Sequence, residues 1–264
     1  MPKQPVEMRS NRRSAQEILE QVIQNGRDEL DRSTQALIFS GLAGGMTMGL
    51  TGLGVAVSKA TLGEGMWQDA ASHLIYPLGF ISVIIGRAQL FTENTLYPVI
   101  IVLDEHRRLL DMLRLWAAVF VSNVIGALIF AALATRTPAL MPAYREELIK
   151  LGLAAVGSSL GFVFWSGVIG GWIIALVAWM VSASHWTIGQ IAIVWMLTFV
   201  VGIGHFAHCI ATSGEILAAV VSGFAPTLTY LRWLAIATMG NIVGGVMIVS
   251  LLNYGQVKAG EQED

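Results

Sequence analysis

Six hydrophobic runs dominate this sequence, and they constrain its fold more than any other feature. A bilayer core of roughly 30 Å takes about 20 helical residues to cross, and every run is at least that long. Only 13% of the residues are charged, about half the share usual in a soluble domain. The sequence therefore predicts an all-α integral membrane protein with six transmembrane helices. We place the spans at roughly residues 36–59, 74–103, 110–135, 154–181, 187–222 and 230–253.

The second and fifth runs are too long for simple crossings, and polar residues interrupt both near the middle. Burying such groups unpaired costs roughly 2 to 7 kcal/mol each, so they are tolerated only where they face protein, water or each other. We predict that helices 2 and 5 are broken there. The interrupting residues are Arg87, Gln89, Glu93 and Asn94 in the second run and His205, His208, Cys209, Thr212, Ser213 and Glu215 in the fifth.

The residues at these interruptions also suggest where the helices restart. Thr212-Ser213-Gly214-Glu215 has the spacing of a capping box, which predicts Thr212 as the N-cap of the second half of helix 5. Thr92 is predicted to do the same in helix 2. Two helix N-termini would then point toward the membrane centre, where their N–H groups and dipoles favour an anion.

The two interrupted runs belong to an internal repeat. Residues 88–94 match residues 208–214 in pattern, with Thr92 opposite Thr212, and each match is followed by an asparagine, Asn123 or Asn241, with a glycine three residues later. Three spans per copy is an odd number, so the copies must have opposite orientations in the membrane. The sequence predicts two inverted three-helix repeats in an aquaporin-like arrangement. Both asparagines are expected to hold the helix breaks by hydrogen bonds.

Two further expectations concern packing. Gly41, Gly45 and Gly49 form a small-residue face on the first span, which predicts close approach to a neighbouring helix. Arg87 and Glu93 lie six residues apart at membrane depth, and a structural ion pair between them is the expected role, with direct contact to the permeant as the alternative.

The regions outside the spans predict the domain organisation. Residues 1–33 mix basic and acidic residues without an apolar core, so we expect no cleaved signal. Ser14 to Glu17 forms a capping-box pattern that starts an amphipathic helix, resting on the cytoplasmic interface or docked on its own bundle. We expect a channel domain at 34–254 and a cytoplasmic tail at 255–264. Basic residues before the first span and in the loop 104–114 place both termini in the cytoplasm.

His208 is the strongest candidate for function among the polar residues in the spans. Histidine has an unperturbed pKa near neutrality, so His208 could donate a hydrogen bond or a proton to a weak-acid anion. His205 is expected to support it. Cys209 beside His208 suggests an intramembrane nucleophile, but adjacent helical residues point about 100° apart, so we expect no enzyme.

The net charge of −2 gives no reason to expect nucleic acid, the single cysteine excludes an intrachain disulfide, and no cofactor or metal site is predicted.

Three motifs resemble the formate/nitrite transporter family of pentameric, aquaporin-like channels. They are residues 88–92, 206–211 and 240–245, and with the six spans the resemblance covers roughly residues 33–253. It implies a pore in each of five protomers, in a cell inner membrane. It also implies that His208 is the central pore histidine, that Thr92 faces it, and that Tyr76 and Val201 lie at two different constrictions. Phe91 and Thr212 are counted as pore residues, and Asn123, Asn241, Arg87, Glu93, Gln89, His205 and Glu215 as supporting ones.

The sequence departs from this family at four positions. Ala155 and Gly171 stand where members that conduct formate or nitrite have a vestibule lysine and an asparagine. Thr212 stands where asparagine is frequent, and Arg87 replaces a glycine. Arg87 either compensates for the missing lysine or pairs with Glu93, and the sequence leaves both open.

We therefore expect a channel or proton-coupled facilitator for a small monovalent weak-acid anion, such as formate or nitrite, with His208 assisting protonation of the anion. The permeant would be the anion or its neutral acid, and the partners would be lipid and copies of the same chain. The alternative is an aquaporin-like channel for small neutral solutes such as water, ammonia or hydrogen sulfide, which would also lack the vestibule lysine.

Overall fold

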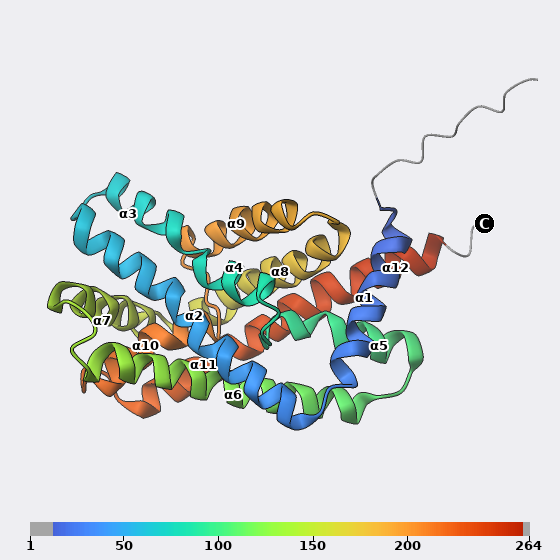
Figure 1. The fold of residues 1–264 in the computed structure, drawn as a ribbon, viewed down its shortest axis with the longest axis horizontal. Helices are drawn as coiled ribbons and strands as arrows, with labels where there is room; N and C mark the ends of the chain where they lie inside the picture. The colour runs from blue at the N-terminus through green and yellow to red at the C-terminus, as the bar shows by residue number, and fades with distance from the viewer. Residues whose placement is uncertain (1–12, 261–264) are drawn as a thin grey trace, which may run out of the picture.

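A computed structural model describes residues 13–260, and every regular element among them is a helix (Figure 1). The first 12 residues of the predicted N-terminal segment and residues 261–264 of the predicted tail lie outside the described residues. The elements are α1 (Ala15–Leu30), α2 (Thr34–Leu62), α3 (Met66–Ser72), η1 (His73–Ile75), α4 (Leu78–Ile85), η2 (Glu93–Thr95), α5 (Tyr97–Glu105), α6 (Leu109–Arg136), α7 (Pro142–Gly157), α8 (Leu160–Ala183), α9 (Thr187–Ile203), α10 (Ala211–Val221), α11 (Thr227–Ile242), η3 (Val243–Ser250) and α12 (Leu251–Gly260).

Four continuous helical segments are long and apolar enough to cross a membrane. They are Thr34–Leu62, Leu109–Arg136, Leu160–Ala183 and Thr227–Gly260, and they contain 29, 28, 24 and 34 residues. The last joins α11, the π-helical η3 and α12 without interruption. At a rise of 1.5 Å per residue each exceeds the roughly 30 Å of a hydrocarbon core.

The runs at 74–103 and 187–222 contain shorter helices joined by irregular backbone. In the first, α4 ends at Ile85 and α5 begins at Tyr97, with only the 3-10 turn η2 between them. In the second, α9 ends at Ile203 and α10 begins at Ala211. A glycine follows the last residue of α4 and of α9, and the residue after each glycine has a left-handed backbone, Arg87 (φ 58°) or His205 (φ 50°). Few non-glycine residues adopt that conformation, and here it turns the chain out of the helix.

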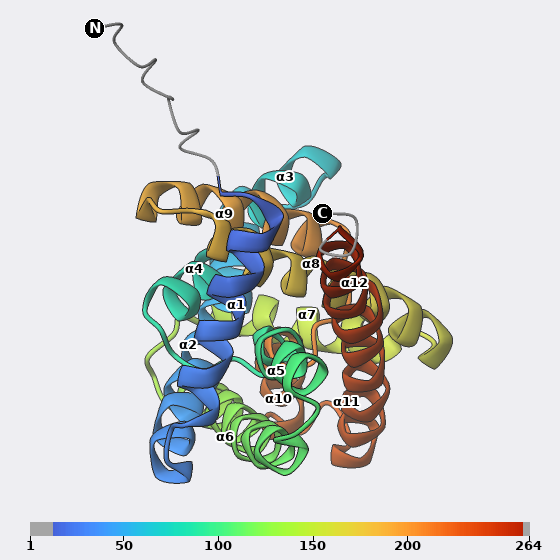
Figure 2. The same cartoon turned by 90° about the vertical axis from the view of Figure 1, so that its right-hand side faces the viewer.

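Seen from the direction of Figure 2, α5 and α10 both fall near the centre of the outline, with α1, α2, α6, α9, α11 and α12 around them. In Figure 1, α3 and α7 lie at one end of the molecule, and α1, α5 and α12 lie at the other. The irregular segments between the short helices therefore lie inside the bundle, where protein covers their backbone.

Glycine lets the longest helices approach closely. A Cβ on Gly45 of α2 would come within 2.1 Å of the Asn123 carbonyl oxygen of α6, and one on Gly41 would reach Ser122. Gly49 faces the ring of Phe130 in the same way. The predicted close packing of the first span through Gly41, Gly45 and Gly49 is confirmed.

The amphipathic helix α1 docks on the bundle. Ser14 and Glu17 form the predicted capping box, which is confirmed. Leu19, Val22 and Leu30 are buried, and α1 packs mainly against α5 and α8. Ion pairs from Arg27 to Glu105 (2.9 Å) and from Arg108 to Asp31 (2.6 Å) fasten its C-terminal half, and Arg13 donates a hydrogen bond to the Ser182 carbonyl.

One predicted boundary is wrong. The sequence predicts that the fourth span begins near residue 154, but α7 continues to Gly157 and α8 begins at Leu160 after the Ser159 N-cap. The serine pair Ser158-Ser159 separates the two helices. At the other end of the chain, the first residues of the predicted tail continue as helix α12 to Gly260.

Candidate functional site

His208 lies in the irregular segment between α9 and α10, and its side chain is completely buried. Its Nδ1 accepts hydrogen bonds from the N–H groups of Ala211 (3.0 Å) and Ile210 (3.3 Å) at the start of α10. Its Nε2 lies 2.8 Å from the Thr92 hydroxyl, which comes from the irregular segment between α4 and α5. The imidazole thus links the two interruptions and caps α10.

This geometry assigns the tautomer of His208. Nδ1 accepts N–H bonds, so its lone pair is occupied and the ring carries its proton on Nε2. Nε2–H then donates to the Thr92 oxygen, and the Thr92 hydroxyl proton is left to donate to another group. Thr92 and His208 together form a neutral hydrogen-bond donor in a buried setting.

Aromatic rings enclose this pair. The Phe80 ring packs edge-on against His208 with a centroid distance of 5.0 Å, and Tyr76 packs against Phe80 at 5.8 Å. Phe91, next to Thr92, packs against Trp116 and Phe120 at 5.6 and 5.0 Å. A charged solute would lose its water between such walls.

Asn123 and Asn241 hold the two irregular segments in the same way. Asn123 accepts from the Phe91 N–H (2.9 Å) and donates to the carbonyls of Gln89 (2.9 Å) and Gly41 (2.8 Å). Asn241 accepts from the Cys209 N–H (2.8 Å) and donates to the carbonyls of Ala207 (2.9 Å) and Gly167 (2.8 Å). Each amide satisfies backbone groups that no helix pairs.

These hydrogen bonds correct the register of the repeat. Gln89 corresponds to Ala207, Phe91 to Cys209 and Asn123 to Asn241, an offset of 118 residues in each case. Arg87 and His205, the two left-handed residues, share that offset. The sequence comparison had paired Thr92 with Thr212, an offset of 120 residues, and this pairing is wrong. The sequence comparison aligned the two threonines because they are the same residue type. The hydrogen bonds of Asn123 and Asn241 show which backbone positions of the two segments are equivalent.

The predicted N-caps are also wrong. Ile210 is the N-cap of α10, Thr212 is the second helical residue, and no side chain of the N-cap closes this end. The His208 ring supplies the cap from two residues earlier. Thr92 occupies the N-cap position of the 3-10 turn η2, but its side chain makes no capping hydrogen bond, and α5 begins after Leu96. The His208 Nδ1 already accepts the N–H groups at the start of α10, so Thr212 is not needed as a cap there. The Thr92 hydroxyl is bonded to the His208 Nε2 and not to a helix end.

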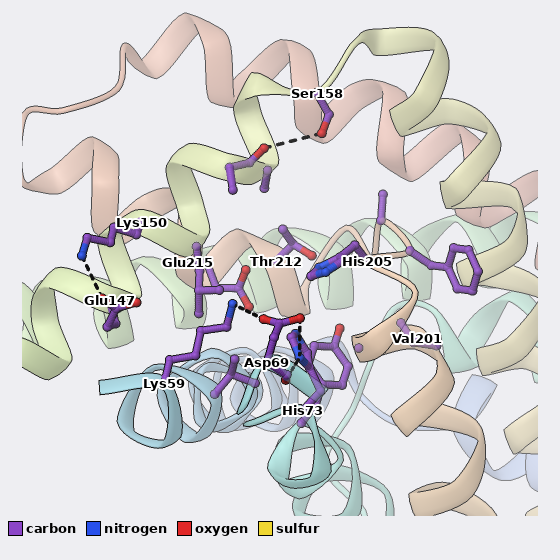
Figure 3. Close-up of a pocket in the computed structure, with 18 of the residues that line it drawn as sticks. Lys59, Asp69, His73, Glu147, Lys150, Ser158, Val201, His205, Thr212 and Glu215 are labelled. Carbon is purple, nitrogen blue, oxygen red and sulfur yellow. Dashed lines mark hydrogen bonds and ion pairs between the residues drawn. The ribbon is translucent and has the colours of Figure 1, made fainter. Parts of the chain in front are cut away.

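A cavity of about 820 Å³ opens at the α3 and α7 end of the molecule (Figure 3). Val201, Tyr76, His205, Thr212 and Glu215 all line it. Tyr76 and Val201 therefore face the same cavity, whereas the family resemblance implied separate constrictions. Tyr76 packs on Gly202, where a Cβ would come 2.5 Å from its ring, and this fixes the aromatic wall between the cavity and Phe80.

Charged side chains surround this cavity, and most are already paired. Lys59 of α2 binds Asp69 of α3 (2.5 Å), and Lys150 of α7 binds Glu146 (2.9 Å) and Glu147 (2.8 Å). The hydrogen bond from Lys59 holds the pKa of Asp69 below its usual value. Ala155, at the position of the missing vestibule lysine, also lines the cavity.

The two histidines near the mouth of this cavity contact each other. His73 Nδ1 donates to the Asp69 carbonyl (2.8 Å), and its ring packs edge-on against His205 at 5.1 Å. His205 lines the cavity (Figure 3), whereas His208 and Thr92 are not among the residues that line it.

Arg87 and Glu93 do not form the expected direct ion pair. No N–O distance between them is within 4.0 Å in the described part of the chain, and Arg87 is exposed. Gln89 binds instead to Glu29 of α1 (2.6 Å) and to Asn94 (2.8 Å). The left-handed backbone at Arg87 directs its side chain outward, which a reading by sequence spacing does not reveal.

Sequence reasoning missed several residues of the site. Phe80 and Trp116 gave no signal because aromatic residues in an apolar run are usually packing residues. Glu29, Lys59 and Asp69 lie outside the interrupted stretches, in α1, near the end of α2 and in α3. Gly171 was read as a lost asparagine, yet a Cβ there would lie 2.2 Å from the Asn241 carbonyl oxygen, so this crossing excludes any side chain.

No group of three or more His, Cys, Asp or Glu side chains among the described residues has the arrangement of a metal site. Cys209 is buried, and its backbone N–H rather than its thiol is engaged with Asn241. The arrangement is that of a polar centre between apolar walls, with an open cavity on one side.

Comparisons with known proteins agree with this geometry. The family described as Formate/nitrite transporter matches residues 16–255. The chain is 30% identical to an Inner membrane protein, YfdC, of Escherichia coli over 247 residues, which cover 92% of this chain and 79% of that protein. It is also 30% identical over 198 residues to a Probable formate transporter of Methanothermobacter thermautotrophicus, covering 68% of this chain and 72% of that protein.

Two solved structures share the fold. An FNT family ion channel aligns with a TM-score of 0.82 and 16% identity, covering 91% of this chain and 99% of that one. A Pentameric formate channel with formate bound aligns with a TM-score of 0.71 and 18% identity, covering 86% and 98%. The all-helical fold, the apolar helices and the matched sequence agree, and this chain belongs to the formate/nitrite transporter family of membrane transport proteins.

Proposed function

We propose that the protein is a channel for a small monovalent weak acid of the formate class, and that the anion is met by His208 and Thr92 at the centre of the bilayer. The observation that carries this proposal is the 2.8 Å contact between His208 Nε2 and the Thr92 hydroxyl, buried between two aromatic walls. Family membership and a probable formate transporter among the relatives support the substrate class.

His208 acts in this proposal as a hydrogen-bond donor and not as the source of the proton. Giving up the Nε2 proton would leave an imidazolate, and adding one to Nδ1 would break its bonds to Ala211 and Ile210. The Thr92 hydroxyl, polarised by Nε2–H, donates to the carboxylate of the permeant. A proton from solvent then joins the anion, and the neutral acid crosses the apolar walls at lower cost than the anion.

The proposed architecture is six transmembrane helices in two inverted three-helix repeats. Four are the continuous segments, and helices 2 and 5 are the broken pairs α4 with α5 and α9 with α10. The shared offset of 118 residues in the asparagine clamps supports the repeat. The channel domain then comprises residues 34–254, with residues 1–33 and the end of the chain as cytoplasmic appendages. Arg27, Arg107 and Arg108 support a cytoplasmic position for this face.

Formate uptake into proteoliposomes tests this function. The wild-type protein should carry formate with a rate that rises as the external pH falls. His208→Asn retains hydrogen-bonding groups but loses the ring geometry, and Thr92→Val removes the hydroxyl at constant shape. We expect each to lower the uptake rate about 10- to 100-fold, the scale of 1.4 to 2.8 kcal/mol. Unchanged formate uptake in both variants would refute the proposal.

A channel for small neutral solutes is the second candidate. The observation in its favour is the cavity, where Ala155 replaces the vestibule lysine and both lysines present are already paired. Water or ammonia flux that is insensitive to pH, together with no formate uptake, would favour it.

A further inference from the structure

Glu215 projects from α10 into the cavity between Lys59 of α2 and His205 (Figure 3). Its side chain packs on Gly52 of α2, where a Cβ would lie 2.6 Å from the Glu215 Cγ and 3.0 Å from Oε1. On the other side, its backbone carbonyl lies against Gly152 of α7. Gly52 thus makes the space for this carboxylate and Gly152 makes the space for the backbone that carries it, so the position of Glu215 follows from the fold.

The Glu215 carboxylate has no hydrogen bond or ion pair within the described residues. The nearest cation on the opposite wall, Lys59, is bound to Asp69 at 2.5 Å. Lys150 is bound to Glu146 and Glu147. The titratable groups that line the cavity with Glu215 are Lys59 of α2, Glu64 of the following turn, Asp69 of α3, His73 of η1, Tyr76, Glu146, Glu147 and Lys150 of α7, and His205.

The lining is therefore acidic overall, with five carboxylates against two lysines. At neutral pH an anion that enters this cavity meets no free cation. It meets Glu215 one turn beyond Thr212, on the helix whose first turn His208 caps. Like charges in a partly enclosed space of low dielectric repel more strongly than they do in water.

We infer that Glu215 is a specificity-determining residue, which favours entry of the neutral acid into this cavity over entry of the anion. The inference rests on the proposed transport of a weak acid. While Glu215 is ionised, only the protonated permeant enters the cavity freely. Once Glu215 is neutral, the anion can approach the Thr92 and His208 pair as well. Transport then depends on pH through the permeant and through this carboxylate.

Formate uptake into proteoliposomes at about pH 5 and about pH 9 tests this role with Glu215→Gln, which removes the charge at nearly constant shape. A permeant must pass through this cavity whichever way the protein is inserted into the liposome membrane. A mixture of the two insertion orientations therefore does not obscure the result. We expect uptake at the higher pH to rise about fivefold, and uptake at the lower pH to stay within about twofold of the wild type. The ratio of the two rates should fall accordingly.

Glu147→Gln is the matched control, because Glu147 lines the same cavity but is already neutralised by Lys150. It should keep the wild-type ratio. An unchanged ratio in Glu215→Gln would overturn the inference, and so would a loss of uptake at both pH values in protein that elutes as a folded oligomer. Failure of the proposed function looks different, because wild-type protein would then show no formate uptake dependent on His208 at either pH.

Discussion

At the scale of single residues, two asparagines and one histidine replace the hydrogen bonds that the helices lose. Asn123 and Asn241 each bind one N–H and two carbonyls, and His208 caps α10. An unpaired buried backbone group costs about 1 to 3 kcal/mol. These three side chains therefore allow irregular backbone at the middle of an apolar bundle, where water cannot satisfy it.

Asn123→Ala tests this accounting. It leaves the Phe91 N–H and the Gln89 and Gly41 carbonyls without their partner, so we expect a loss of about 2 to 5 kcal/mol of stability. Thermal unfolding in detergent, followed by tryptophan fluorescence, measures the loss. Asn253→Ala is the control, because the Asn253 amide makes one bond, to the Val249 carbonyl of its own helix. Equal melting temperatures for the two variants would contradict this role.

At the scale of helices, glycine decides how closely α2 and α6 approach. Gly45 faces the Asn123 backbone at a distance that leaves no space for a methyl group, whereas a Cβ on Gly255 of α12 meets nothing within 4 Å. Both glycines are helical. The two positions therefore separate packing from helix propensity.

We expect Gly45→Ala to destabilise the protein by about 1 to 3 kcal/mol, because it forces the two helices apart. Gly255→Ala should be neutral or stabilising by up to about 1 kcal/mol, because alanine favours the helix. The same melting experiment measures both. A melting temperature that is higher for Gly45→Ala than for Gly255→Ala would show that the crossing of α2 and α6 tolerates a side chain.

The attachment of α1 to the end of α5 should depend on pH. Hydrogen bonds from Arg27 and Arg107 lower the pKa of Glu105 below its ordinary value of 4.5. A lowered pKa in the folded state stabilises the attachment above the ordinary pKa, and the contribution is lost as the pH falls through the lowered value. Hydrogen exchange of α1 amides should thus accelerate as the pH is lowered below about 4.5, after correction for intrinsic rates. Glu105→Gln should show the weakened protection already at neutral pH.

At the scale of the whole molecule, the long helices expose many apolar side chains, among them Val121, Leu128 and Leu133 of α6 and Phe162 and Trp165 of α8. Such surfaces face lipid or other copies of the chain. The resemblance of the sequence to the formate/nitrite transporter family predicts five copies in a ring.

Native mass spectrometry from mild detergent tests that assembly. Five chains of 28.4 kDa should give a particle of about 142 kDa after detergent release. A mass that corresponds to one, two or three chains under conditions that preserve activity would contradict the pentamer.

The sequence by itself determined the class of the protein and the residues of its centre. Length and hydropathy of the six runs predict membrane helices because a bilayer sets the length of an apolar helix. Polar residues inside those runs pointed to His208, Thr92, Asn123 and Asn241 because hydrocarbon tolerates such groups only with partners. That Thr92 faces His208 was implied by the family resemblance and not by a pattern in the residues themselves.

Only the tertiary structure decided the register of the repeat, the helix caps and the partners of the charges. Thr92 and Thr212 look equivalent in sequence, but the asparagine bonds pair Phe91 with Cys209. Arg87 and Glu93 look like a pair, but Gln89 binds Glu29 of a helix 60 residues earlier. Local pattern records which residues are polar and buried. Which groups meet depends on where distant helices cross. Glu215 of α10, for example, packs into the space that the missing side chain of Gly52 leaves on α2.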